Sequence, residues 1–294
     1  NILRTQSKYE EGSKVLKEAR NEFVEIGDRR GAAQCLQSLG NILRTQSKYE
    51  EGSKVLKEAR NEFVEIGGDR RGAAQCLQSL GDILHMQSKY EEGSKVMKEA
   101  RKEFVETEDR LGAAYCSNFL GNVLCTQSKY EEGSKVLTEA KKEYVEIGDR
   151  SGAAYCSRSL GEVLCMQSKY EEGSKVVTEA RSEFVEIGDR HGAAQCSQSL
   201  GEILRMQSKY ENAWTVLMAA RKEFVEIEDC IGAAQCLQNL GEVLRMQSKY
   251  DDGWTVLTEA RKEFVEIEDH LGAAWCTNRL KEIELRRDSS CITH

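Results

Sequence analysis

The stretch GAAQCLQSLGNILRTQSKYE, residues 31–50, followed by EGSKVLKEARNEFVEI, residues 51–66, is the unit on which the chain is built. It recurs every 40 or 41 residues almost to the C-terminus. Residues 1–27 repeat letter for letter as residues 41–67, and one extra glycine, Gly68, is the single slip in the period. A fixed period of this length predicts an array of stacked units, because one unit cannot bury its apolar face alone.

The composition indicates a soluble, all-α protein. Of the 294 residues 39% are hydrophobic, 31% are charged and none is proline, which suits a chain that is helical almost throughout. The net charge is −8, and Lys and Arg alternate with Glu along the chain. Because a nucleic-acid binder needs a basic stripe, we expect no nucleic-acid partner. The apolar runs are short, so we expect no membrane partner and a cytoplasmic location.

The cysteines follow the repeat and not a cross-linking scheme. Seven of the 11 hold one repeat position, which is occupied by Cys35, Cys76, Cys116, Cys156, Cys196, Cys236 and Cys276. Each falls in the apolar stripe of a predicted helix, where a free cysteine packs as a small hydrophobic residue. We therefore expect core packing in a reducing compartment.

Two helices are expected in each unit. In the first, apolar or small residues recur with helical spacing, and in the second Gly52, Leu56, Ala59 and Phe63 are spaced by four, three and four. The motif Ser-x-x-Glu at residues 47–50 predicts a capping box at the start of the second helix. The Gly-Asp-Arg stretch between units predicts a turn with the Asp as N-cap of the next first helix.

We read one continuous array over residues 1–294. The expected units are residues 1–30 (the end of a first helix plus a second helix), 31–71, 72–111, 112–151, 152–191, 192–231 and 232–271, then a capping helix at 272–287 and a tail at 288–294. The last copy carries Lys281 where the others have glycine, which would block close packing of another helix. The chain starts midway through a repeat, which predicts a fragment of a longer protein.

The pattern Leu39-Gly40, Tyr49, Gly52, Leu56 and Ala59 resembles the tetratricopeptide repeat. Glycine and alanine at these places allow helices to approach closely, so the pattern has a physical cause. The period is 40 and not 34, and the proline that ends the second helix is absent. In these respects the chain resembles the subclass of the LGN/Pins polarity scaffolds and the arrays of fungal NLR-type proteins. The resemblance implies an α-solenoid of stacked antiparallel helix pairs.

The resemblance also implies that the first helices line a concave groove, through positions six and three before the anchor glycine and one and four after it. We name these positions the first-helix row. The candidate peptide-binding residues in it are Gln75, Gln78, His85, Tyr115, Asn118, Asn122, Tyr155, Arg158, Glu162, Gln195, Gln198, Glu202, Arg205, Gln235, Gln238, Glu242, Arg245 and Trp275. The other members are Gln34, Gln37, Asn41, Arg44, Asp82, Cys125, Cys165, Asn278, Glu282 and Leu285.

The copies differ most along this row, which favours recognition of a partner or free drift at exposed sites. Amides and arginines suit hydrogen bonding to a peptide, and the aromatic residues supply buried area. Arg205 and Arg245 each follow a glutamate by three residues, so pairing within the helix is the alternative role for them. His85, Cys125 and Cys165 share one repeat position, but successive packed helices lie about 8–10 Å apart, too far for one metal ion.

No phosphate-binding loop or catalytic motif is present, so we expect neither an enzyme nor a cofactor or metal. The sequence predicts a protein–protein interaction scaffold that binds a peptide segment of its partner along the first-helix row. The alternative is an oligomerisation or sensor segment of a larger, NLR-like signalling protein, with possible self-association. A recently expanded array without a dedicated ligand is the third hypothesis.

Overall fold

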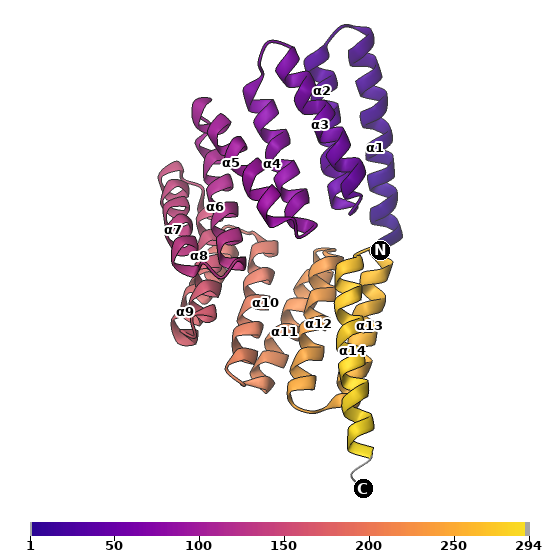
Figure 1. The fold of residues 1–294 in the computed structure, drawn as a ribbon, viewed down its shortest axis with the longest axis vertical. Helices are drawn as coiled ribbons and strands as arrows, with labels where there is room; N and C mark the ends of the chain where they lie inside the picture. Colours follow the sequence, from indigo (N-terminus) through magenta and orange to yellow (C-terminus); the bar gives the residue numbers. More distant parts are fainter. Residues whose placement is uncertain (1, 292–294) are drawn as a thin grey trace. The chain divides into compact units, whose positions relative to one another are not determined.

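The chain forms helices joined by short turns in a computed structural model that describes the backbone of residues 2–291 and the side chains of residues 8–286 (Figure 1). The described part contains no strand. The helices are α1 (Ile2–Glu25), α2 (Arg29–Thr45), α3 (Tyr49–Glu65), α4 (Arg70–Met86), α5 (Tyr90–Glu106), α6 (Arg110–Thr126), α7 (Tyr130–Ile147), α8 (Arg150–Met166), α9 (Tyr170–Glu186), α10 (Arg190–Met206), α11 (Tyr210–Glu226), α12 (Cys230–Met246), α13 (Tyr250–Glu266) and α14 (His270–Cys291).

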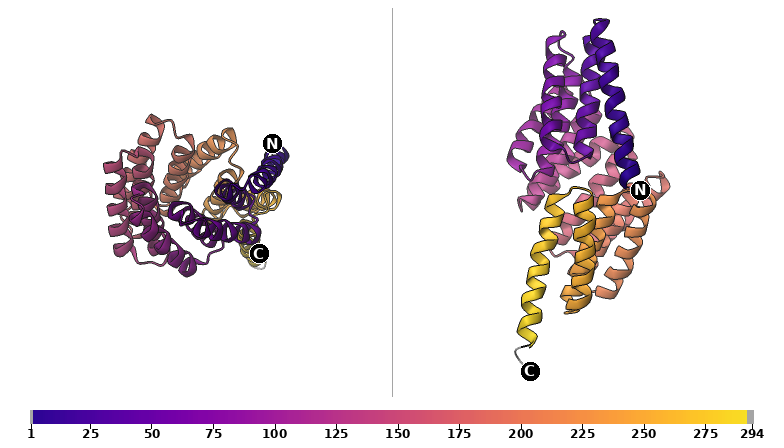
Figure 2. Two further views of the ribbon diagram at one scale, coloured as in Figure 1. Left: turned by 90° about the horizontal axis from the view of Figure 1, so that it is seen from above. Right: turned by 90° about the vertical axis from the view of Figure 1, so that its right-hand side faces the viewer.

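Consecutive helices pack as antiparallel pairs, and the fold is the all-α solenoid that the repeat predicts. Two compact units are present, residues 3–153 and residues 154–294, with the boundary inside α8. In the first unit each helix from α2 to α7 packs on the next, and in the second the same holds from α9 to α14 (Figure 2). The continuity of the array across the boundary stays a prediction of the repeat pattern.

Each pair of helices is closed by the same buried contacts. The anchor Gly40 faces Leu56 of the second helix so closely that a Cβ at Gly40 would lie 2.5 Å from Leu56 Cγ. Gly72, at the start of the next first helix, meets the ring of Phe63 in the same way, with a distance of 2.7 Å. Leu56 and Phe63 are buried. Close approach through glycine is therefore confirmed as the basis of the packing.

The repeat-position cysteines are buried and free, which confirms their place in the core. Burial raises the pKa of Cys76, Cys116, Cys196 and Cys236 to about 12. These thiols stay protonated at neutral pH, and reactive or metal-binding cysteines need the thiolate form.

An arginine on each of several second helices bonds to a glutamate on the next second helix. Arg20 Nη2 donates to Glu58 Oε1 at 2.9 Å, and Arg60 Nη2 donates to Glu99 Oε1 at 2.7 Å. In the second unit Arg221 Nη2 donates to Glu263 Oε1 at 2.8 Å. The arginine at one fixed position of the repeat thus donates the hydrogen bond at each of these contacts between neighbouring second helices.

The aspartate N-caps are confirmed, whereas the predicted capping box is wrong. Asp69 Oδ1 accepts from Gly72 N at 2.9 Å, as its counterparts do in the other first helices. At the start of α3, however, Lys48 is the N-cap residue and makes no side-chain capping bond. Ser47 instead ends the preceding turn with φ 58°, and Lys48 N donates to Leu43 O at 2.9 Å. The serine occupies the left-handed position that commonly follows a helix.

The first copy departs from the predicted helix pair, because α1 is a single unbroken helix. The same letters at residues 42–65 form a helix, a turn at Ser47 and a second helix. The left-handed conformation of a non-glycine residue such as Ser47 costs roughly 1–2 kcal/mol of conformational free energy. The packing of α2 on its neighbouring helices offsets that cost. At the other end, α14 continues to Cys291, past the expected end of the capping helix, and residues 292–294 of the expected tail lie outside the described part.

Candidate functional site: the first-helix row

The first-helix row lies on α2, α4 and α6 in the first unit and on α10, α12 and α14 in the second, with its α8 members at the boundary helix. Most of its side chains are half-buried. Neighbouring members bond to each other, since Gln37 Nε2 donates to Gln75 Oε1 at 3.2 Å and Gln198 Nε2 donates to Gln235 Oε1 at 3.4 Å. In each unit, neighbouring first helices are therefore bonded to each other directly through members of the row.

In the first unit, Tyr115 and Asp82 form the central contact of the row. The Tyr115 hydroxyl donates to Asp82 Oδ1 at 3.0 Å across two first helices. Burial raises the pKa of Asp82 to about 6, although this hydrogen bond works in the opposite direction. His85 packs edge-on against Tyr90 and Phe119, and burial lowers its pKa. These members hold neighbouring repeats together as well as facing the surface.

In the second unit, Tyr155 and Glu162 are also engaged by neighbouring repeats. The Tyr155 ring packs edge-on against Phe184 with centroids 4.6 Å apart, and its hydroxyl donates to Asp189 Oδ2 at 3.4 Å. Glu162 Oε1 accepts from Arg158 Nη1 and from Ser199 Oγ, each at 2.5 Å. Tyr155 is thus part of the core of the repeat as well as a member of the row.

The two arginines with glutamates three residues earlier differ in their contacts. Arg245 Nη2 donates to Glu242 Oε2 at 2.9 Å, so the pairing within the helix is present there. Glu202 instead accepts from Asn239 Nδ2 of the next first helix at 2.8 Å. Burial raises the pKa of Glu202. Arg205 keeps a buried Nε that has no hydrogen-bond partner among the described residues.

Unpartnered polar atoms concentrate on the first-helix row. Among the described residues, eight buried side-chain nitrogen or oxygen atoms lack a partner, and five of them belong to the row: Asn41 Oδ1, Arg44 Nε, Arg158 Nε, Gln195 Oε1 and Arg205 Nε. The other three are Nε atoms of second-helix arginines. Leaving such a group unpaired costs about 1–3 kcal/mol.

A further variable position was missed by the sequence analysis, the second residue of each first helix. It is Arg30, Arg71, Leu111, Ser151, His191, Ile231 and Leu271 in turn, beside an invariant Gly-Ala-Ala. Where it is basic, it bonds to the N-cap aspartate of the following first helix. Arg71 Nε lies 2.7 Å from Asp109 Oδ2, and His191 Nε2 lies 3.1 Å from Asp229 Oδ2. Comparing the copies letter by letter at this position would have found it.

His191 makes the stability of the fold depend on pH. Its hydrogen bond with Asp229 raises the His191 pKa, so the folded chain binds this proton more tightly than the unfolded chain. The stabilisation is complete below the unfolded histidine pKa of about 6.5 and is lost as the pH rises through the folded value. We expect His191→Gln to lower the melting temperature more at about pH 5.5 than at about pH 8.5.

Circular dichroism melts at the two pH values measure this difference. Asp229→Asn is the matched control, because asparagine still caps α12 but carries no charge. In that background His191→Gln should lose its pH-dependent part. Equal melting shifts at both pH values in the otherwise unchanged chain would contradict the assignment.

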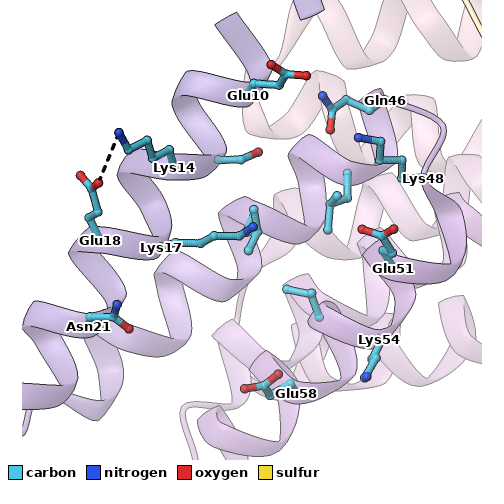
Figure 3. Close-up of a pocket in the computed structure, with 14 residues that line it drawn as sticks. Glu10, Lys14, Lys17, Glu18, Asn21, Gln46, Lys48, Glu51, Lys54 and Glu58 are labelled. Carbon is cyan, nitrogen blue, oxygen red and sulfur yellow. Dashed lines mark ion pairs between the residues drawn. The ribbon is translucent and has the colours of Figure 1, made fainter. Parts of the chain in front are cut away.

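Several cavities lie between helices in the part of the chain whose side chains are described. A cavity of about 650 Å³ lies among α1, α2 and α3, and the apolar Leu39 and Val55 are part of its lining. Figure 3 shows the charged side chains that surround it. Its rim carries Lys14, Lys17, Lys48 and Lys54 against Glu10, Glu18, Glu51 and Glu58. The charges of this rim balance. Another of about 500 Å³ lies at the C-terminal ends of α12 and α14 and is lined by Arg245 and Arg286 with Glu282.

The third cavity, of about 450 Å³, opens on the first-helix row of the second unit. Its lining includes Gln198, Glu202, Gln235, Gln238, Asp269 and Trp275. It contains two carboxylates and no lysine or arginine. The structure thus brings five candidate residues from α10, α12 and α14 around one acidic cavity.

Neither a metal-ligand cluster nor a membrane-spanning helix is found in the part of the chain that the structure describes. No group of three or more His, Cys, Asp or Glu side chains is placed to hold a metal ion. No helix there combines the length and the apolar character that crossing a bilayer requires. The expectation that the chain is not an enzyme stays a prediction.

No family model and no curated protein matches the sequence. Solved structures resemble the fold. A Rap protein complexed with Competence and Sporulation Factor is 17% identical, with a TM-score of 0.64 over 88% of this chain and 75% of that one. A tetratricopeptide repeat protein from Parabacteroides merdae is 13% identical, with a TM-score of 0.58 over 93% and 99% of the two chains.

A third similar structure is a signal transduction ATPase with numerous domains and a tetratricopeptide repeat sensor, from Pyrococcus horikoshii. It is 14% identical, with a TM-score of 0.60 over 93% of this chain and 45% of that one. The fold of this chain is thus that of tetratricopeptide-like repeat arrays.

Proposed function

We propose that the protein is an interaction scaffold that binds a peptide segment of a partner protein along the first-helix row. The observation that carries the proposal is the row of half-buried amide, arginine and aromatic side chains that successive first helices hold next to one another. The amides and side chains of an extended peptide could bond to such a row at several repeats in succession. The resemblance to a Rap protein that is complexed with Competence and Sporulation Factor supports the same reading.

Arg205 provides the test in the second unit, because among the described residues its Nε has no partner and the nearby Glu202 of its own helix is bonded to Asn239 instead. Peptides selected from a displayed random library on the unaltered chain serve as probes. We expect Arg205→Glu to weaken their binding at least about tenfold, which corresponds to about 1.4 kcal/mol. Isothermal titration of the selected peptides measures the change.

The matched control is Lys175→Glu, which makes the same charge change at an exposed site on α9. It should leave the affinity unchanged, and both variants should keep the helical circular dichroism signal. If Arg205→Glu binds the peptides as tightly as the unaltered chain does, the row is not the binding surface.

A second candidate function is the sensor or oligomerisation segment of a larger, NLR-like signalling protein. The exposed face of α14 supports it, because Ala274 is exposed whereas its counterparts Ala194 and Ala234 are fully buried. The similarity to an ATPase with a tetratricopeptide repeat sensor agrees with this function. Light scattering at micromolar concentration separates the candidates, since a monodisperse monomer argues against self-assembly. The more specific resemblance to LGN/Pins scaffolds is part of the first proposal, that of a peptide-binding interaction scaffold.

A further inference from the structure

Three of the N-cap aspartates of the first helices, Asp69, Asp109 and Asp229, pair with a basic side chain through their second carboxylate oxygen. In these caps Oδ1 accepts from the backbone, as Asp109 Oδ1 does from Gly112 N at 2.9 Å. The other oxygen then pairs with a base from the preceding first helix. Arg30 Nε lies 2.8 Å from Asp69 Oδ2, and Asp109 has an equivalent partner in Arg71. His191 occupies the same place against Asp229.

Asp269 caps the start of α14 in the same way, but its second carboxylate oxygen has no basic partner among the described residues. Its Oδ1 accepts from Leu271 N at 3.1 Å and from Gly272 N at 3.0 Å. The residue that would supply the base is Ile231, an aliphatic side chain that is 41% exposed. No basic side chain of the described residues forms an ion pair with Asp269. The place that a guanidinium or imidazole fills at three other joints is therefore unfilled here.

This unfilled place is part of the acidic cavity of about 450 Å³ between α10, α12 and α14. Glu202 lines the same cavity, where Asn239 fixes one of its oxygens at 2.8 Å. The side-chain amides of Gln235 and Gln238 add further acceptors. The Trp275 ring already accepts one guanidinium, since Arg279 Cζ lies 5.0 Å from its centroid. Carboxylates, amide oxygens and an indole together suit a planar cation.

We propose that this cavity binds an arginine side chain of the partner peptide. The guanidinium would pair with Asp269 and lie near Glu202, and it would take the place that Arg71 takes against Asp109 in the first unit. Arginine is preferred to lysine because its planar fork can bond to a carboxylate and an amide together. The exposed side chain of Leu271, which lines the cavity, would contact an apolar neighbour of that arginine. The inference rests on the proposed peptide-binding function and names the chemistry of its ligand.

Two variants of the full chain test the cavity. Ile231→Arg places a base where three other joints have one, so it should pair with Asp269 from within the chain and compete with a bound guanidinium. Asp269→Asn removes the charge and keeps a good N-cap. The controls make the same changes at the joint of α6 and α8, where Leu111 precedes Asp149: Leu111→Arg and Asp149→Asn. The probes are peptides selected from a displayed random dodecapeptide library on the unaltered chain, and arginine amide alone.

We expect the selected peptides to share an arginine at one position. Replacing that arginine by alanine should weaken binding at least about tenfold, or about 1.4 kcal/mol. Ile231→Arg and Asp269→Asn should each remove this dependence on the arginine, whereas Leu111→Arg and Asp149→Asn should retain it. Arginine amide should compete only at far higher concentration than the peptides. This result would identify the ligand as a peptide that contains arginine and not as a free arginine-like small molecule.

The outcomes separate this inference from the proposed function. If the selected peptides lack a shared arginine, or if Asp269→Asn leaves their affinity unchanged while Arg205→Glu lowers it, the row binds peptides and the cavity assignment is overturned. If no peptide is enriched on the unaltered chain, the proposed function fails and the inference fails with it. Melting curves show that each variant is folded before its binding is compared.

Discussion

Phe184→Ala lowers the free energy of unfolding by about 3–5 kcal/mol, the largest loss that we expect from one side chain. Phe184 is fully buried between α9 and α10 and packs edge-on against Tyr155. A Cβ at Gly192 would collide with its ring, so the backbone of α10 lies directly on this side chain. Removal of the ring leaves a cavity that the close helix contact cannot collapse to fill. Guanidinium unfolding followed by circular dichroism measures the loss.

Two substitutions on the same turns serve as controls. Phe184→Tyr should be tolerated, because Tyr144 holds the equivalent position in α7 and is also buried. Val185→Ala changes a side chain that is 57% exposed and should stay within about 0.5 kcal/mol of the unaltered chain. A loss below about 1 kcal/mol for Phe184→Ala would contradict the packing described for α9 and α10.

Gly173→Ala and Gly253→Ala should shift stability in opposite directions although both replace the same repeat position. A Cβ at Gly173 would lie 2.6 Å from Gly161 O and closer still to Cys165 Sγ. The carbonyl is part of the facing backbone and cannot turn aside, so we expect a loss of about 1–3 kcal/mol. At Gly253 the nearest atoms are 3.6 Å away. There alanine should stabilise the helix by up to about 1 kcal/mol.

Nature supplies a precedent within the chain, since Ala213 holds this position in α11 and is fully buried. Chemical unfolding of the two variants in parallel measures the difference. Adding Cys165→Ala to Gly173→Ala should recover only part of the loss, because the contact with the Gly161 carbonyl remains. A neutral Gly173→Ala would mean that the two helices of this repeat can separate without cost.

The helices and their buried faces were predictable because each depends on a local period. Apolar residues at helical spacing mark the face that Leu56 and Phe63 bury, and glycine at fixed places marks the close contacts. The caps were predictable only in part. Asp69 caps α4 as its type suggests, but Ser47 takes the left-handed position and not the N-cap. Serine is compatible with an N-cap position and with a left-handed turn position, so the residue type alone does not decide between the two.

Tertiary context decides the features that the sequence analysis missed. Residues 2–25 and 42–65 have the same letters, yet only the second set contains a turn. For several side chains of the first-helix row the partner lies on another repeat, as Asp82 does for Tyr115 and Asn239 does for Glu202. A reading of one repeat cannot supply such a pair. For this reason the candidate residues could be placed on a surface, but not sorted into paired and unpaired groups.

The arginine–glutamate contacts between second helices have a consequence for how such a chain can change. Arg20 bonds to Glu58 and Arg60 bonds to Glu99. Both bonds use the same two positions of the repeat, so these successive contacts between second helices are made by the same pair of residue types. A repeat that is inserted carries both the arginine and the glutamate of this contact, so it can bond to the repeat before it and to the repeat after it. A deleted repeat removes both together. The copy number of this part of the array can therefore change while the arginine–glutamate contact is kept between neighbouring copies, and each added copy extends the first-helix row without requiring a new kind of helix contact.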